Sequence, residues 1–113
     1  MSEREWSFYL DDMIRFSGKV LAYTGGLGQE SFESDEKVFD ATLRNLELIG
    51  EAAAHIPDSI REKSSAIPWR QVVATRNRLI HGYLGIDNDI LWSIVQDDIP
   101  VLLQELKKMK DSL

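Results

Sequence analysis

Hydrophobic positions recur along most of the chain at the three- and four-residue spacing of helices that bury one face. Residues 4–23 show this spacing first, and the glycine-rich stretch 24–28 is expected to end that helix. A second helix is predicted over about 35–55. Ser34 is its expected cap, and Pro57 is expected to stop it.

Proline, aspartate and glycine positions divide the rest of the chain. Pro68 is expected to open a third helix, which runs to the next glycines. Asp87 is the expected cap of a fourth helix, in which Pro100 predicts a kink or a division near Ile99. Gly50 lies in the middle of the second helix, where a glycine costs about 1 kcal/mol, and it predicts a close contact between helices.

The predicted fold is all-α, because no segment shows sustained period-two alternation. Short connections favour a single four- to five-helix bundle, mostly antiparallel, in one domain over residues 1–113. The hydrophobic share of 43% excludes a disordered chain, and no apolar run approaches the ~20 residues of a membrane span. We therefore expect no membrane association. The charged N-terminus predicts no signal peptide, so a cytoplasmic protein is expected.

Charge is distributed unevenly. The net charge of −6 argues against a nucleic-acid partner, because phosphate binding requires a positive surface. Residues 60–86, however, hold five basic side chains and one acidic side chain, while both flanking parts are net acidic. One basic segment therefore lies within an acidic protein.

That segment contains the candidate chemistry, in the stretch from Arg76 to Tyr83. Asn77 and His81 are four residues apart and share a helix face, so Asn77 could fix the tautomer of His81. Arg76 and Tyr83 share another face. Arginine binds phosphate through two hydrogen bonds and histidine transfers protons at neutral pH, which favours a phosphodiester site. Arg76 and His81 are five apart, so they meet on one ligand only if the helix loosens or the ligand bridges both faces.

A structural interpretation of these residues remains open. Arg76 would then pair with an acidic residue, and His81 would lie at the negative end of the helix dipole. His55, near the end of the second helix, fits such a dipole role better than a catalytic one. Two isolated histidines and no cysteine predict no metal site, and the pair Asp97 and Asp98 is more typical of a solvated surface.

The motif Arg-x4-His-x-Tyr, with polar Asn77 after the arginine, resembles the signature of HEPN-domain ribonucleases, and more specifically of the HepT toxin family. The similarity extends over roughly residues 8–106. Further blocks resemble family segments in the same order: 44–53, 67–70, 79–87, and 91–92 with 98–100.

The resemblance implies an all-helical homodimer in which two motifs meet at a cleft. It implies metal-independent RNA cleavage, without a cofactor, by attack of the ribose 2′-OH to leave a 2′,3′-cyclic phosphate. Arg76 would hold the scissile phosphate, His81 would be general acid or base, and Asn77 would orient the site. Tyr83 matches the tyrosine that the family's antitoxin, a minimal nucleotidyltransferase, modifies with AMP.

The expected function is therefore an endoribonuclease toxin of a type VII-like toxin–antitoxin system. Arg70 and Arg78, in the basic segment, are expected to contact the RNA. The alternative is a non-catalytic subunit that binds a nucleotide or a partner nucleotidyltransferase. A third possibility is a purely structural helical dimer.

Overall fold

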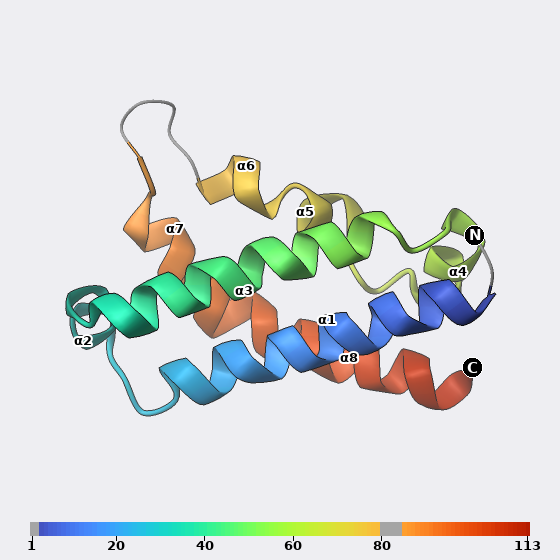
Figure 1. Ribbon diagram of the computed structural model, residues 1–113, viewed down its shortest axis with the longest axis horizontal. Coiled ribbons are helices and arrows are strands. Elements are labelled where there is room, and N and C mark those ends of the chain that lie inside the picture. The colour runs from blue at the N-terminus through green and yellow to red at the C-terminus, as the bar shows by residue number, and fades with distance from the viewer. Residues whose placement is uncertain (1–2, 80–84) are drawn as a thin grey trace.

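The computed structural model describes residues 3–79 and 85–113, and three long helices form its body. They are α1 (Glu3–Thr24), α3 (Glu36–Ala54) and α8 (Ile99–Ser112). Helix α1 packs against both of the others and runs opposite to them (Figure 1). The described residues thus confirm the predicted all-α antiparallel bundle.

The connection between α1 and α3 differs from the prediction in two details. Gly26 ends α1 in the left-handed region, with φ of 79°, as the glycines predicted. A short helix, α2 (Gln29–Ser34), follows and was not predicted. Asp35, not Ser34, caps α3, because the Asp35 carboxylate accepts a hydrogen bond from the Val38 N–H at 3.2 Å. The Ser34 hydroxyl instead donates to the carbonyl of Ser31.

The predicted third helix is two helices, and the prediction of a single one was wrong. They are α5 (Trp69–Val73), which begins directly after Pro68 as expected, and α6 (Thr75–Leu79). The Thr75 hydroxyl donates to the Val72 carbonyl at 2.8 Å. In a continuous helix that carbonyl would accept a backbone N–H, so the hydroxyl competes with helical hydrogen bonding there. Before α5, the chain makes short helical turns at α4 (Asp58–Arg61) and Glu62–Ser64.

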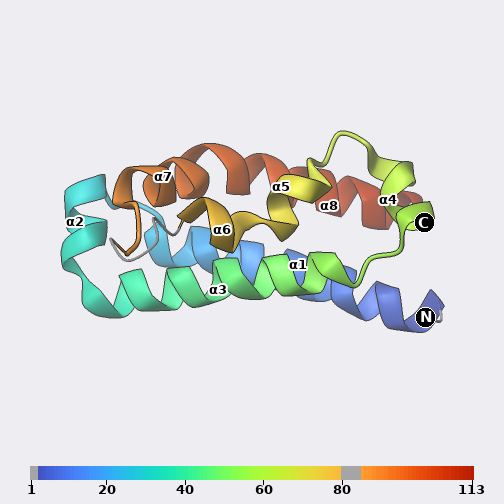
Figure 2. The ribbon, with the colours of Figure 1, turned by 90° about the horizontal axis from the view of Figure 1, so that it is seen from above.

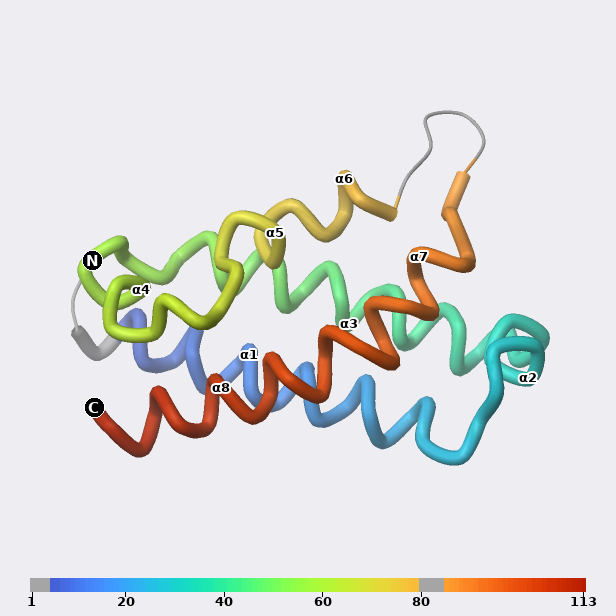
Figure 3. The backbone as a smooth tube through the Cα atoms, turned by 180° about the vertical axis from the view of Figure 1, so that it is seen from behind, coloured from blue at the N-terminus to red at the C-terminus, as the bar shows by residue number. Residues whose placement is uncertain are grey.

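The C-terminal helices confirm the predicted change near Ile99. Asp87 caps α7 (Asn88–Ser93) by accepting from the Ile90 N–H at 3.0 Å. A π-helical segment, Ile94–Asp98, then leads into α8, whose second residue is Pro100. Pro100 has no N–H to donate, and the wider π turn lies directly before it. Figure 3 shows α7 and α8 following one another as one continuous coil.

The core lies between α1, α3 and the α7–α8 coil. Its largest fully buried side chains come from these helices and from α2 and α6, and they include Met13, Phe32, Leu46, Leu79 and Leu106. The ring of Phe32 packs at a tilt against that of Trp92, with centroids 5.2 Å apart, which joins α2 to α7. Within the described ranges, no helix has the length and apolar character needed to cross a membrane.

Candidate functional site

The joint between α5 and α6 is held against the C-terminal part of α3 at Gly50. Gly50 is buried, and a Cβ atom built there would lie 3.2 Å from the carbonyl oxygen of Val72 and 3.4 Å from that of Val73. The expected close contact at Gly50 is therefore confirmed. Because of it, α6 begins directly beside α3 (Figure 2).

Arg76 faces α3 across a shallow groove of about 230 Å³. The groove is lined from α3 and from the α5–α6 segment by Leu46, Glu47, Gly50, Glu51, Ala54, Val73 and Arg76. Arg76 is exposed, and it forms no ion pair with any other residue that the structure describes. Its guanidinium group is thus open to an anion from solvent. The alternative prediction, in which Arg76 pairs with an acidic residue, finds no support within these ranges.

The remaining motif residues lie at the end of α6 or beyond it. Asn77 follows Arg76 on α6 and is exposed. His81 and Tyr83 lie outside the described residues, so the predicted Asn77–His81 contact is not placed. A backbone hydrogen bond links the described residues before and after this segment, because the Asp87 N–H donates to the Leu79 carbonyl at 2.9 Å.

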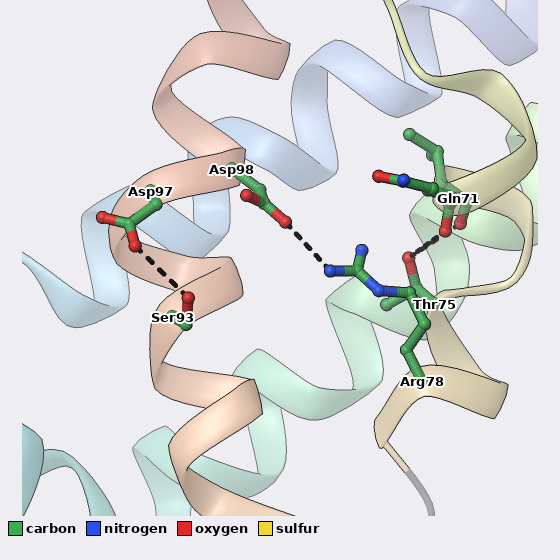
Figure 4. Close-up of polar contacts among 7 residues, drawn as sticks. Gln71, Thr75, Arg78, Ser93, Asp97 and Asp98 are labelled. Atoms are coloured by element: carbon green, nitrogen blue, oxygen red, sulfur yellow. Dashed lines mark hydrogen bonds and ion pairs between the residues drawn. The ribbon is translucent and has the colours of Figure 1, made fainter.

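Arg78 points toward Asp98 in the C-terminal helices (Figure 4). Its guanidinium lies 3.5 Å from the carboxylate of Asp98, in the π-helical segment. Both side chains are partly exposed, so this ion pair contributes little to stability. Arg70 is exposed on α5. It lines neither the groove of Arg76 nor a second groove between α5–α6 and α8. The structure therefore does not bring Arg70 or Arg78 into the groove of Arg76.

A second groove, of about 240 Å³, lies between α5–α6 and the start of α8. Its floor is apolar, with Val72, Ile94 and Leu102 among the lining residues. Val101 lies in it and is 57% exposed. Three carboxylates and one cation also line it: Asp97, Asp98, Glu105 and Arg78. No sequence pattern predicted this groove, because its two walls are far apart in the chain.

His55 has the structural place that its sequence position predicted. It is the C-terminal cap of α3, and its exposed ring stacks on Tyr9 with centroids 4.4 Å apart. No group of three or more histidine, aspartate or glutamate side chains in the described ranges is arranged to hold a metal ion.

Sequence reasoning missed the carboxylates of the first groove. Glu47 and Glu51 are four residues apart on α3, on either side of Gly50, and both line the groove of Arg76. Their spacing places them on one helix face, but only the packing of α6 shows which groups face them.

A small helical bundle with an exposed arginine in a groove, within a basic segment of the chain, is suited to bind a phosphodiester. Comparison with known proteins is consistent with that class, since residues 13–109 match the HepT-like ribonuclease family. A candidate RNase of Methanocaldococcus jannaschii is 36% identical over 107 residues, which cover 95% of this chain and 98% of that protein.

Two further relatives agree. A candidate ribonuclease HepT of Thermococcus cleftensis is 35% identical over 96% of this chain and 98% of its own length. A candidate RNase of Caldanaerobacter subterraneus subsp. tengcongensis is 33% identical over 89% of this chain and 90% of its own. No solved structure matches the chain. The protein belongs to the HepT-like ribonuclease family, and the predicted family is confirmed.

Proposed function

We propose that this protein is a metal-independent RNA endonuclease that uses Arg76 to hold the scissile phosphate. The observation that carries the proposal is the open position of Arg76 in the groove between α3 and α6, in a chain of this ribonuclease family. The guanidinium can donate two parallel hydrogen bonds to phosphate oxygens, a geometry that a lysine ammonium does not offer.

The proposed reaction is attack of a ribose 2′-oxygen on the adjacent phosphorus. The P–O2′ bond forms and the P–O5′ bond breaks, which leaves a 2′,3′-cyclic phosphate and a 5′-hydroxyl. Arg76 would balance the negative charge that grows on the phosphate oxygens. His81 would act as general acid or base, and Asn77 would orient it. No metal ion or cofactor takes part.

The proposal extends to the larger assembly. A homodimer would place two copies of the motif at one cleft and supply a second His81. A minimal nucleotidyltransferase would be the antitoxin partner, and it would silence the toxin by transferring AMP to Tyr83. Arg70 and Arg78 would bind RNA outside the groove of Arg76.

The test is incubation of the purified protein with a labelled RNA in EDTA, followed by analysis of the new ends. We expect internal cleavage that leaves a 2′,3′-cyclic phosphate. An RNA with a single 2′-deoxynucleotide at the cleavage position should resist cleavage there. Cleavage of that deoxy-substituted position, or activity that requires an added metal ion, would contradict the mechanism.

A second candidate function, a partner-binding subunit, is favoured by the groove between α5 and α8. Its apolar floor, exposed Val101 and three carboxylates suit an apolar segment of a partner flanked by basic residues. The groove is separate from Arg76, so a partner bound there would leave the first groove open. On this alternative, the chain binds the nucleotidyltransferase and cuts no RNA.

Val101→Glu tests this groove, because the side chain is already exposed and the fold should tolerate the change. We expect affinity for the cognate nucleotidyltransferase to fall about tenfold or more, as for an interface anchor. Phe8→Glu is the matched control, since Phe8 is 55% exposed on α1. Binding by Val101→Glu that equals binding by wild type would exclude the groove as the docking site.

A further inference from the structure

The three carboxylates of the groove between α5–α6 and α8 are not equivalent. Asp98 lies 3.5 Å from the guanidinium of Arg78, and Glu105 lies 3.5 Å from the ammonium of Lys108. The charge of each is therefore partly balanced by a cation of the same chain. Asp97 forms no ion pair with any residue of 3–79 or 85–113.

Asp97 is nevertheless held in position. Its carboxylate accepts a hydrogen bond from the Ser93 hydroxyl at 3.2 Å (Figure 4). The hydroxyl carries no charge, so it orients the carboxylate without neutralising it. Asp97 belongs to the π-helical segment Ile94–Asp98, and π turns inside helices occur frequently at functional sites. An oriented carboxylate at the rim of the groove is thus left for a cation from outside the described chain.

An exposed apolar side chain lies on the next turn of the same coil. Val101 follows Asp97 by four residues, and both line the groove. Val101 stands beside Val72 and Leu102, which are buried in the floor. A carboxylate and an apolar side chain one turn apart are complementary to a helix that carries a cation and an apolar side chain at the same spacing.

The charge of the groove selects between classes of occupant. Its lining residues include three carboxylates and one guanidinium, that of Arg78, so their net charge is −2. A negative lining repels the phosphates of a nucleic acid and attracts a basic protein segment. The ion pair of Arg78 with Asp98 joins the two walls of the groove and does not involve Asp97.

We propose that Asp97 is the residue through which this groove selects a basic amphipathic helix of a partner protein. A lysine or arginine of that helix pairs with Asp97, and an apolar side chain one turn away lies on Val101. This inference rests on the docking function proposed for the groove, and it names the residue and the spacing that determine its specificity. It does not depend on RNA cleavage.

The test uses two synthetic helical peptides, one of leucine and lysine at amphipathic spacing, and one with glutamate in place of every lysine. Each is titrated into the ¹⁵N-labelled full chain, and amide chemical shifts are followed. We expect the lysine peptide to shift the amides of Val72, Asp97, Val101 and Leu102, and the glutamate peptide to leave them unchanged.

Asp97→Asn removes the charge and keeps an oxygen that can accept from Ser93, so the melting temperature should stay at the wild-type value. We expect its affinity for the lysine peptide to fall about fivefold, as for a well-formed ion pair near a surface. Glu105→Gln is the matched control, since it removes one charge from the same groove. Its affinity should stay close to that of wild type, because Lys108 already balances part of the lost charge.

Equal losses of affinity in Asp97→Asn and Glu105→Gln would assign the effect to the charge of the whole groove and overturn the inference. Undiminished binding by Asp97→Asn would also overturn it, while docking at the groove would stand. If neither peptide shifts the groove amides, the docking function itself fails, and the role of Asp97 with it. Shifts of the same amides when the chain is concentrated without peptide would assign the groove to a second copy and overturn the inference.

Discussion

Arg76 and Arg78 show how neighbours in the sequence can serve different surfaces. The two arginines leave opposite sides of α6, so one lines the groove toward α3 and the other reaches Asp98. The sequence identified Arg76 as the phosphate-binding candidate, because its spacing to His81 and Tyr83 could be read directly. It could not identify Glu51, because only the packing of α3 on α6 places that residue in the groove of Arg76.

The predicted RNA contacts of Arg70 and Arg78 can be tested through salt dependence. Each contact of a cation with single-stranded RNA contributes about 0.7 to the slope of log K against log salt. Arg70→Ala should lower RNA affinity and reduce that slope by about this amount. Arg78→Ala should change it less, since Asp98 already balances part of its charge. Filter binding from low to high salt measures both slopes. An unchanged slope in Arg70→Ala would exclude that contact.

Among the helices, boundaries set by caps and prolines were predictable, and those set by tertiary contacts were not. Pro68 and Asp87 were correctly predicted to start helices, because their effects are local. The break between α5 and α6 was missed. It depends on the Thr75 hydroxyl and on the approach of the Val72 and Val73 carbonyls to Gly50. This break orients Arg76, so part of the site depends on packing that no local pattern reveals.

The packing at Gly50 predicts opposite effects for two glycine-to-alanine changes. Gly18 lies inside α1, and a Cβ built there meets nothing within 4 Å. Gly18→Ala should therefore stabilise the protein by about 0.5–1 kcal/mol through helix propensity. Gly50→Ala must push the α5–α6 joint away from α3, because its Cβ meets two backbone carbonyls. That displacement should cancel the gain or reverse it.

Urea unfolding of both variants measures the difference. We expect a higher urea midpoint for Gly18→Ala and an unchanged or lower one for Gly50→Ala. Gly50→Ala should also cut RNA more slowly, since it moves Arg76 relative to α3. A Gly50→Ala protein that gains as much stability as Gly18→Ala would show that the contact is loose.

At the scale of the whole molecule, a groove lies on either side of α5–α6 among the described residues. The groove toward α3 holds Arg76, and the groove toward α8 has an acidic rim. The net charge of −6 argued against RNA, yet the basic segment 60–86 supplies the arginine of the first groove. The acidic remainder would limit nonspecific binding to nucleic acid, since repulsion opposes contacts outside the basic segment.

The most direct test of the central claim compares Arg76→Ala with wild type in RNA cleavage under EDTA. Arg15→Ala, an exposed arginine on α1, is the control for loss of one positive charge. We expect kcat/KM to fall by about 10²-fold or more for Arg76→Ala and to stay near normal for Arg15→Ala. If Arg76→Ala folds and cuts RNA as fast as wild type, Arg76 does not hold the scissile phosphate.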